Sequence, residues 1–279
     1  MDILLIGILI FISKFFIMVT LKPCADHFKS KENTYFISTW ILLSGTVAIV
    51  SSWEGAKPFL YSPLLIFSVL KGFIVWNSTK ISTEILKENV SSISFQHFIS
   101  LGVSALILNA FFGETLSIIA QLSILFMGIL GLLFFIVGPG SKLSKEGLKR
   151  LTKLIFLVMS LIIIDHIVIK NTHWALHLFI YAVSFFTISL ISSHSLKNWE
   201  KIFIQKETLI AGSVIAFAEI LFMFSMSLMP ISLAVFFARL TIPLIMVYSS
   251  IKYKEDKWSH ELFFGALAII FALPIIFDI

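Results

Sequence analysis

Long apolar runs recur along the whole chain and are separated only by short polar stretches. A run of about 20 apolar residues is the length that crosses the hydrocarbon core of a bilayer as a helix. The pattern therefore predicts an all-α integral membrane protein with ten transmembrane helices. The predicted spans are 3–21, 35–52, 60–86, 89–112, 118–138, 152–170, 174–193, 206–229, 231–251 and 261–277.

The composition agrees with a chain embedded in lipid. Charged residues make up 13% of the chain, against roughly 25% in soluble domains. The first span lacks a basic leading region and a cleavage site and carries Lys14, so we expect it to remain as a mature helix. The single cysteine, Cys24, excludes an internal disulfide and a cysteine-based metal site.

The positive charges indicate an orientation rather than a nucleic-acid partner. Most of the 21 Lys and Arg residues lie in or beside the loops that follow odd-numbered spans. Because short cytoplasmic loops carry an excess of Lys and Arg, these loops are predicted to be cytoplasmic, with both termini outside. The predicted location is the cytoplasmic (inner) membrane of a bacterium.

The second half of the chain repeats the first. A shift of 141 residues places Glu114 on Glu255 and Ser91 on Ser232. Five predicted spans precede a basic loop and five follow it, so the two copies would cross the membrane with opposite polarity, as in many transporters. The predicted parts are two inverted five-helix repeats, 1–138 and 152–279, and a basic connecting loop, 139–151.

The two repeat ends resemble a known family. The segments FGETLSIIAQLSILFMGILGLL and PLIMVYSSIKYKEDKWSHELFFGALAIIFALPI resemble the repeat ends of the drug/metabolite transporter superfamily, in its ten-helix EamA-like branch. Pro243 stands about where that family has a proline, although Gly102 stands where another is common. The resemblance implies a secondary transporter whose eighth span faces a central cavity. It also implies cytoplasmic termini, contrary to the lysine distribution.

The turn residues Glu114 and Glu255 have two interpretations. Both lie in short hairpins between apolar spans. We expect them to cap or pin these hairpins, and the alternative is a salt bridge that gates access to a site.

Ionisable side chains at bilayer depth are unfavourable by roughly 2.5 to 3.5 kcal/mol each, so each needs a partner or water. Lys14, Lys71, Glu219 and Arg239 lie nearest to mid-span, whereas Asp165 lies nearer a helix end, from which it can reach the interface. A lone carboxylate among apolar residues holds a proton unless a cation is close. Glu219 is therefore predicted to couple protons or, alternatively, to pair with Lys71 or Arg239.

Polar side chains on the third, fourth and ninth spans complete a predicted substrate site. Arg239 offers a fixed fork of donors for a carboxylate or phosphate. One face of the fourth span carries a polar stripe of Asn89, Ser92, Gln96, Ser100 and Ser104. This stripe either lines a water-filled cavity or bonds to another helix. The predicted substrate-binding residues are Arg239, Lys71, Trp76, Gln96, Ser92 and Lys14, with Glu219 as the proton-coupling residue.

These features predict a secondary active transporter that moves a small polar metabolite by alternating access, either with protons or as an exchanger. The mid-span excess of basic residues favours anionic or zwitterionic substrates. The expected partners are the substrate, the bilayer and protons, with no nucleic acid, no cofactor and no metal, in a monomer or homodimer. The alternatives are a non-transporting membrane subunit and an intramembrane enzyme. The enzyme alternative depends on His173 and His177, which have metal-ligand spacing but lack a nearby glutamate.

Overall fold

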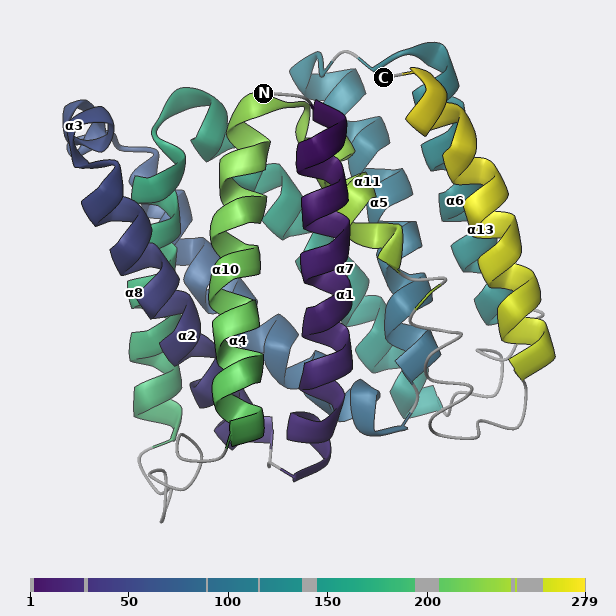
Figure 1. Ribbon diagram of the computed structural model, residues 1–279, viewed down its shortest axis with the longest axis horizontal. Coiled ribbons are helices and arrows are strands. Elements are labelled where there is room, and N and C mark those ends of the chain that lie inside the picture. Colours follow the sequence, from purple (N-terminus) through teal and green to yellow (C-terminus); the bar gives the residue numbers. More distant parts are fainter. Residues whose placement is uncertain are drawn as a thin grey trace. The chain divides into compact units, whose positions relative to one another are not determined.

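The computed structural model describes residues 3–27, 30–88, 90–114, 116–136, 145–193, 206–241, 244 and 258–278. All regular elements in these ranges are helices, which confirms the all-α class (Figure 1). They are α1 (Ile3–His27), α2 (Ser30–Ser51), α3 (Trp53–Ala56), η1 (Lys57–Phe59), α4 (Leu65–Glu88), α5 (Val90–Phe112), α6 (Ile118–Ile136), α7 (Lys145–Asn171), α8 (Trp174–Ser192), α10 (Lys206–Leu228), α11 (Ile231–Arg239) and α13 (Trp258–Asp278).

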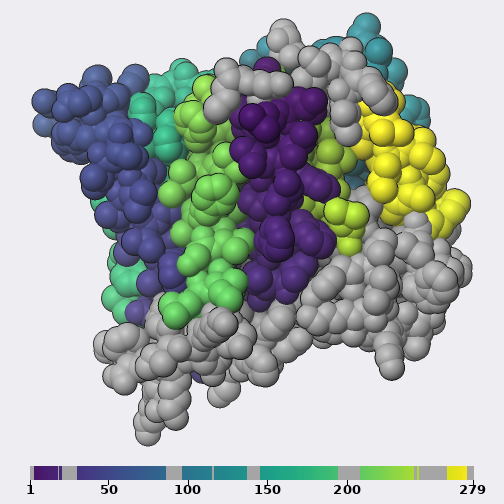
Figure 2. Space-filling model, in the orientation of Figure 1, coloured from purple at the N-terminus to yellow at the C-terminus, as the bar shows by residue number. Residues whose placement is uncertain are grey.

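Five of the described helices are long and apolar enough to cross a membrane. They are α2, α6, α7, α8 and the 208–228 part of α10. Large apolar side chains face outward on them, including Val47 of α2 and Phe217 of α10. The helices α2 and α10 lie side by side on one face in Figure 2. These helices are compatible with an integral membrane protein, and the full set of ten spans stays a prediction.

The chain forms two compact units, and each draws on both halves of the sequence. Unit 1 contains Met1–Phe15, Ile85–Met159 and Met229–Ile279, and unit 2 contains Phe16–Glu84 and Ser160–Leu228. The compact units therefore differ from the predicted sequence repeats. The final residues of the predicted connecting loop, from Lys145 onward, are helical and begin α7.

Unit 1 is built on close contacts of its helices. α6 packs against α5 and α13, and α11 packs against α5 (Figure 1). A Cβ added to Gly102 of α5 would lie 3.0 Å from the Cα of Gly128 of α6, so these two backbones meet directly. Small residues permit this close approach between helices in a membrane.

Glu114 caps the N-terminus of α11 within unit 1. The N-cap residue of this helix, Pro230, has no side-chain acceptor for the first backbone N–H groups. The Glu114 carboxylate accepts the N–H of Ile231 at 2.5 Å and the N–H of Ser232 at 3.3 Å, and it also accepts the Ser232 hydroxyl. This geometry agrees with the predicted capping role, although the capped helix belongs to the other half of the chain. Glu255 lies outside the described residues.

Unit 2 is centred on α8. α2 and α10 pack against α8 and against each other. A Cβ on Gly45 of α2 would lie 2.9 Å from the Cα of Phe179, and one on Gly72 of α4 would lie 2.7 Å from the backbone oxygen of Tyr181. Lys71 is the residue before Gly72. Because α4 approaches the α8 backbone so closely at Gly72, the side chain of Lys71 is buried inside unit 2.

Candidate functional site

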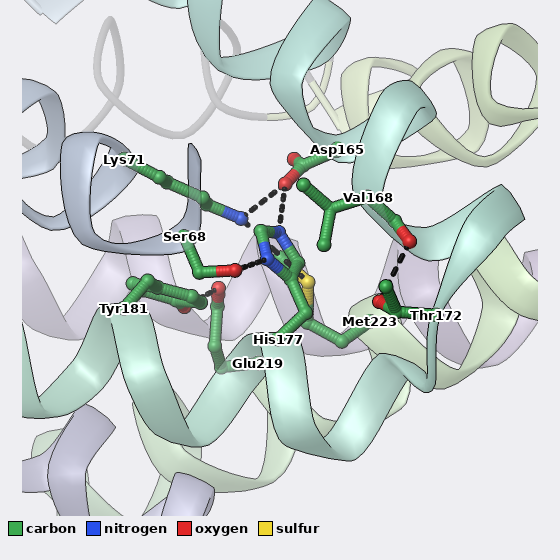
Figure 3. Close-up of polar contacts among 9 residues, drawn as sticks. All are labelled: Ser68, Lys71, Asp165, Val168, Thr172, His177, Tyr181, Glu219 and Met223. Carbon is green, nitrogen blue, oxygen red and sulfur yellow. Dashed lines mark hydrogen bonds and ion pairs between the residues drawn. The ribbon is translucent and has the colours of Figure 1, made fainter. Parts of the chain in front are cut away.

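A buried network of polar side chains lies inside unit 2 (Figure 3). Four helices supply it, and all of its members except Glu219 expose at most 3% of their surface. Glu219 is partly buried. The network consists of Ser68 and Lys71 from α4, Asp165 from α7, His177 and Tyr181 from α8, and Glu219 from α10.

An ion pair between Lys71 and Asp165 is the core of the buried network. The Nζ atom of Lys71 lies 2.5 Å from Oδ1 of Asp165. The same Nζ lies 3.7 Å from the sulfur of Met223 and 4.1 Å from the centre of the Tyr181 ring. The ammonium group is thus surrounded by a carboxylate, a soft sulfur and an aromatic face, which together replace the water that it loses on burial.

The His177 ring bridges the ion pair to α4. Its Nε2 atom lies 2.8 Å from Oδ1 of Asp165, and its Nδ1 atom lies 2.7 Å from the hydroxyl of Ser68. Because this carboxylate oxygen already accepts from an ammonium group, Nε2 must carry the hydrogen and donate to it. In a neutral ring, Nδ1 then accepts a hydrogen bond from the Ser68 hydroxyl.

Tyr181 links Glu219 to the rest of the buried network. The Tyr181 hydroxyl donates to Oε1 of Glu219. The Tyr181 ring also packs against the His177 ring, with centroids 5.8 Å apart, and lies under the Lys71 ammonium. From the sequence, Glu219 was predicted to couple protons or to pair with Lys71 or Arg239. In the structure, its carboxylate accepts a hydrogen bond from Tyr181.

Helical spacing and one hairpin bring these side chains together. Pairs three or four residues apart share a helix face: Ser68 and Lys71, His177 and Tyr181, and Glu219 and Met223. The turn between α7 and α8 reverses the chain at 172–173 and brings Asp165 to the depth of His177. The expectation that Asp165 reaches the interface is wrong, because α7 continues to Asn171 and the carboxylate is buried.

The sequence contained a signal for this pair. In DHIVIKNTHWALH, Asp165 and His177 lie on opposite arms of the turn at 172–173, each within about two helical turns of it. In a tight antiparallel helical hairpin, polar residues so close to the turn can meet across the two arms. Sequence reasoning treated the two residues separately and therefore missed their contact.

Trp76 lies on the same helix as Lys71, about one and a half turns further along. Its Nε1 donates to the hydroxyl of Ser192 on α8 at 3.2 Å, and the Lys80 ammonium lies 5.8 Å from the centre of its ring. The structure therefore places the predicted substrate residues Lys71 and Trp76 in unit 2, both against α8.

Other predicted substrate residues gather in unit 1. The charges of Arg239 and Lys14 both act on the ring of His97 on α5, and the side-chain amide of Gln96 lies 2.7 Å from Nδ1 of that ring. The Nε atom of Arg239 is buried and has no hydrogen-bond partner among the described residues. Lys14, His97 and Arg239 belong to unit 1, whereas the buried network belongs to unit 2.

The polar stripe on α5 forms hydrogen bonds along its own helix. Ser100 donates to the backbone oxygen of Gln96 at 2.9 Å, and Ser104 donates to that of Ser100 at 2.6 Å. All three side chains expose at most 1% of their surface. Among the described residues, their hydrogen bonds thus do not join α5 to another helix. Asn89 and the side chain of Ser92 lie outside the described residues.

The two histidines of the metal alternative face different partners. His177 is part of the buried network, whereas Nδ1 of His173 accepts the N–H of Ala175 at 3.3 Å and caps α8. In the part of the chain that the structure describes, no three His, Cys, Asp or Glu side chains are arranged to hold a metal ion.

The His173 cap predicts a pH-dependent stability. Burial lowers the pKa of His173 from its ordinary value of 6.5, so the unfolded chain binds this proton at higher pH than the folded one. The stabilisation is therefore present above 6.5 and is lost as the pH falls below 6.5 through the folded pKa. We expect His173→Asn, which keeps an N-cap acceptor, to reduce the fall of the thermal midpoint on acidification. Equal falls in both proteins would contradict this role.

Two comparisons with known proteins found no relative of this chain. No family model matches the chain, and no curated protein matches it at a significant level.

Proposed function

We propose that the protein is a secondary active transporter that moves a small polar metabolite by alternating access. The observation that carries the proposal is the buried network, in which four helices bring opposite charges together among apolar residues. Charged side chains at such depth are unfavourable unless they form a functional or paired site, and in membrane proteins they commonly mark substrate and proton pathways. A subunit with only a scaffolding role does not require them.

The helix boundaries support the proposed architecture of ten spans in two inverted repeats. A shift of 141 residues carries the first residues of α4 and α5, Leu65 and Val90, onto the first residues of α10 and α11, Lys206 and Ile231. The same shift carries the last residue of α2 onto the last residue of α8. Equivalent helices also pack on each other, α2 on α8 and α6 on α13.

We also propose that the chain is a member of the drug/metabolite transporter superfamily, which its two repeat ends resemble in sequence. In transporters built from inverted repeats, the substrate site lies near the membrane midplane between equivalent elements. We place the protein in the cytoplasmic membrane of a bacterium, as a monomer or homodimer.

The proposed substrate carries an anionic or zwitterionic group. Arg239 is the main candidate ligand, because its buried Nε lacks a hydrogen-bond partner among the described residues and a planar guanidinium matches a carboxylate or phosphate. Lys14, Gln96 and Ser92 complete this part of the proposed site. Lys71 and Trp76, which belong to unit 2, are the other proposed substrate residues, and Glu219 is the proposed proton-coupling residue. Lys71 is held by Asp165, so an anionic substrate must compete with that carboxylate.

A thermal-stability screen of the purified full chain tests the proposal. Amino acids, amines, nucleosides, nucleotides and sugar phosphates are tested on the wild type and on Arg239→Ala and Arg239→Lys. A ligand at a hundredfold excess over its Kd stabilises the folded state by about 2.7 kcal/mol. We expect an anionic compound to raise the thermal midpoint of the wild type and to lose this effect in Arg239→Ala.

The control for the screen is Arg150→Ala. Arg150 forms a partly exposed pair with Glu146, at 3.5 Å on the same helix, and we expect its replacement to leave the ligand response unchanged. Equal loss of anionic and neutral ligands in Arg239→Ala would assign a structural role to Arg239. No response to any compound class would favour a non-transporting membrane subunit.

A further inference from the structure

The segment that joins α2 to α4, residues 52–64, is fixed to the rest of unit 2 by its inner side. We call this segment the α2–α4 connection. Ala56 is fully buried and packs in one apolar cluster with Leu176 of α8. A Cβ added to Gly55 would lie 2.9 Å from Nε2 of His173, so the connection also touches the turn before α8. It therefore has a defined place at the end of the α2–α8 pair (Figure 1).

The outer side of the α2–α4 connection carries large aromatic rings beside charged groups. Trp53 exposes 45% of its surface and Tyr61 exposes 96%. Glu54 and Lys57, which lie between them in the sequence, are exposed as well. Trp and Tyr rings with an apolar body and a polar tip are enriched where the hydrocarbon of a membrane meets water. The exposed composition is thus that of a membrane interface.

Outward-facing apolar side chains adjoin the connection on both sides. Val50 in the last turn of α2 exposes 74% of its surface, and Ile66 in the first turn of α4 exposes 65%. Further along the same helices, Val47 and Phe73 also face outward. The connection therefore lies where two apolar outer surfaces end.

The backbone of the connection does not suit the hydrocarbon layer. The chain forms a short 3-10 helix at Lys57–Phe59 and then turns until α4 begins at Leu65. Irregular backbone exposed to lipid does not occur within the hydrocarbon, because its polar groups lack partners there. Bulk water does not suit the exposed rings either, because their apolar surface is better removed from water. The phospholipid headgroup layer meets both requirements.

A second turn at the same end of unit 2 has the same composition. Lys170 at the end of α7 is exposed, and Trp174 at the start of α8 is partly exposed. The Trp174 ring stacks on His173, with centroids 5.9 Å apart, and His173 is the residue that Gly55 approaches. Two turns far apart in the sequence thus bring tryptophan and lysine to one end of the unit.

We infer that the α2–α4 connection is an interfacial anchor that binds the phospholipid headgroup layer. The rings of Trp53 and Tyr61 lie at the level of the lipid glycerol groups, and the ammonium of Lys57 contacts lipid phosphates. Lys57 and Lys170 exceed the single carboxylate of Glu54 at these two turns, and a net positive charge attracts phosphate. The anchor is independent of transport and requires only that the chain is embedded in a bilayer.

The anchor also gives a depth for the buried ion pair. Lys71 follows Leu65, the first residue of α4, by six residues, which is about 9 Å along the helix axis. The hydrocarbon layer is about 15 Å thick from its edge to its centre. With the connection at the edge, the Lys71–Asp165 pair lies within the hydrocarbon layer.

Spin labels on the full chain in lipid nanodiscs test the position of the anchor. The native cysteine is removed by Cys24→Ser, and one label is attached to Tyr61→Cys, Val50→Cys or Glu146→Cys, all at exposed side chains. Oxygen concentrates in the hydrocarbon, whereas a soluble nickel complex stays in water. We expect the label at 61 to meet less nickel than the label at 146 and less oxygen than the label at 50. Helical circular dichroism confirms that each labelled protein is folded.

Charge reversal tests the phosphate contact. Lys57→Glu places a carboxylate at the level of the phosphates, so the label at 61 should meet more nickel in nanodiscs that contain phosphatidylglycerol. Lys57→Gln is the matched variant and should have a smaller effect. The same increase in nanodiscs of phosphatidylcholine alone would reject a contact with anionic lipid.

Three results at position 61 would overturn the anchor. A label as accessible to nickel as the one at 146 would place the connection in water, and a label as accessible to oxygen as the one at 50 would place it in the hydrocarbon. Dipolar broadening between labels, in vesicles that hold several copies, would identify a second copy of the chain as the occupant. If the label at 50 also lies in water, the chain is not embedded, and the proposed transporter fails together with the anchor.

Discussion

Replacement of Asp165 by asparagine is expected to lower the free energy of unfolding by about 3 to 5 kcal/mol. Asp165 is the partner of the Lys71 ammonium at 2.5 Å, and both side chains are almost completely buried. The substitution leaves a positive charge in an apolar interior without its nearest counter-charge. Equilibrium unfolding of the purified protein, followed by helical circular dichroism, measures the loss.

A double variant separates the ion pair from other effects of the substitution. Removal of both charges in Lys71→Met with Asp165→Leu leaves no unpaired ion, and replacement of a buried ion pair by apolar residues is often neutral or stabilising. We expect this double variant to be more stable than Asp165→Asn alone. If it is less stable by the sum of two independent losses, the two residues do not act as a pair.

Removal of the Glu114 carboxylate is expected to produce the second large effect, a loss of about 2 to 4 kcal/mol in Glu114→Ala. Three donors lose their acceptor together: the N–H groups of Ile231 and Ser232 and the hydroxyl of Ser232. Pro230 has no side chain that could replace this cap. Because α11 carries Arg239 in its last turn, the ligand response of that arginine should also weaken.

Two control variants define the origin of this effect. Glu114→Gln keeps one carbonyl oxygen as an acceptor and should lose less stability than Glu114→Ala. Glu146→Ala removes an exposed carboxylate that pairs with Arg150 on the same helix, and we expect a change of at most about 0.5 kcal/mol. A loss in Glu114→Ala no larger than that in Glu146→Ala would show that the cap contributes little to stability.

Several properties of this protein follow from local patterns that the sequence contains. The apolar runs determine where most helices begin and end, because the period and length of a run decide which segment forms a helix. The predicted span 174–193 thus corresponds to α8, Trp174–Ser192, and 118–138 corresponds to α6, Ile118–Ile136. A structural role for Glu114 was also predictable, because a carboxylate in a tight turn between apolar runs lies close to helix ends.

Only the tertiary structure decided which polar residues meet. Lys71 pairs with Asp165, and this partner was not among the candidates, because residues 94 positions apart share no pattern along the chain. Their contact depends on the packing that brings α4 and the α7–α8 hairpin together. Likewise, Glu114 reaches α11 rather than its own hairpin, because packing of α11 against α5 presents unpaired N–H groups to it. Secondary structure arises from neighbouring residues, whereas a buried charge takes its partner from whichever helix the fold places beside it.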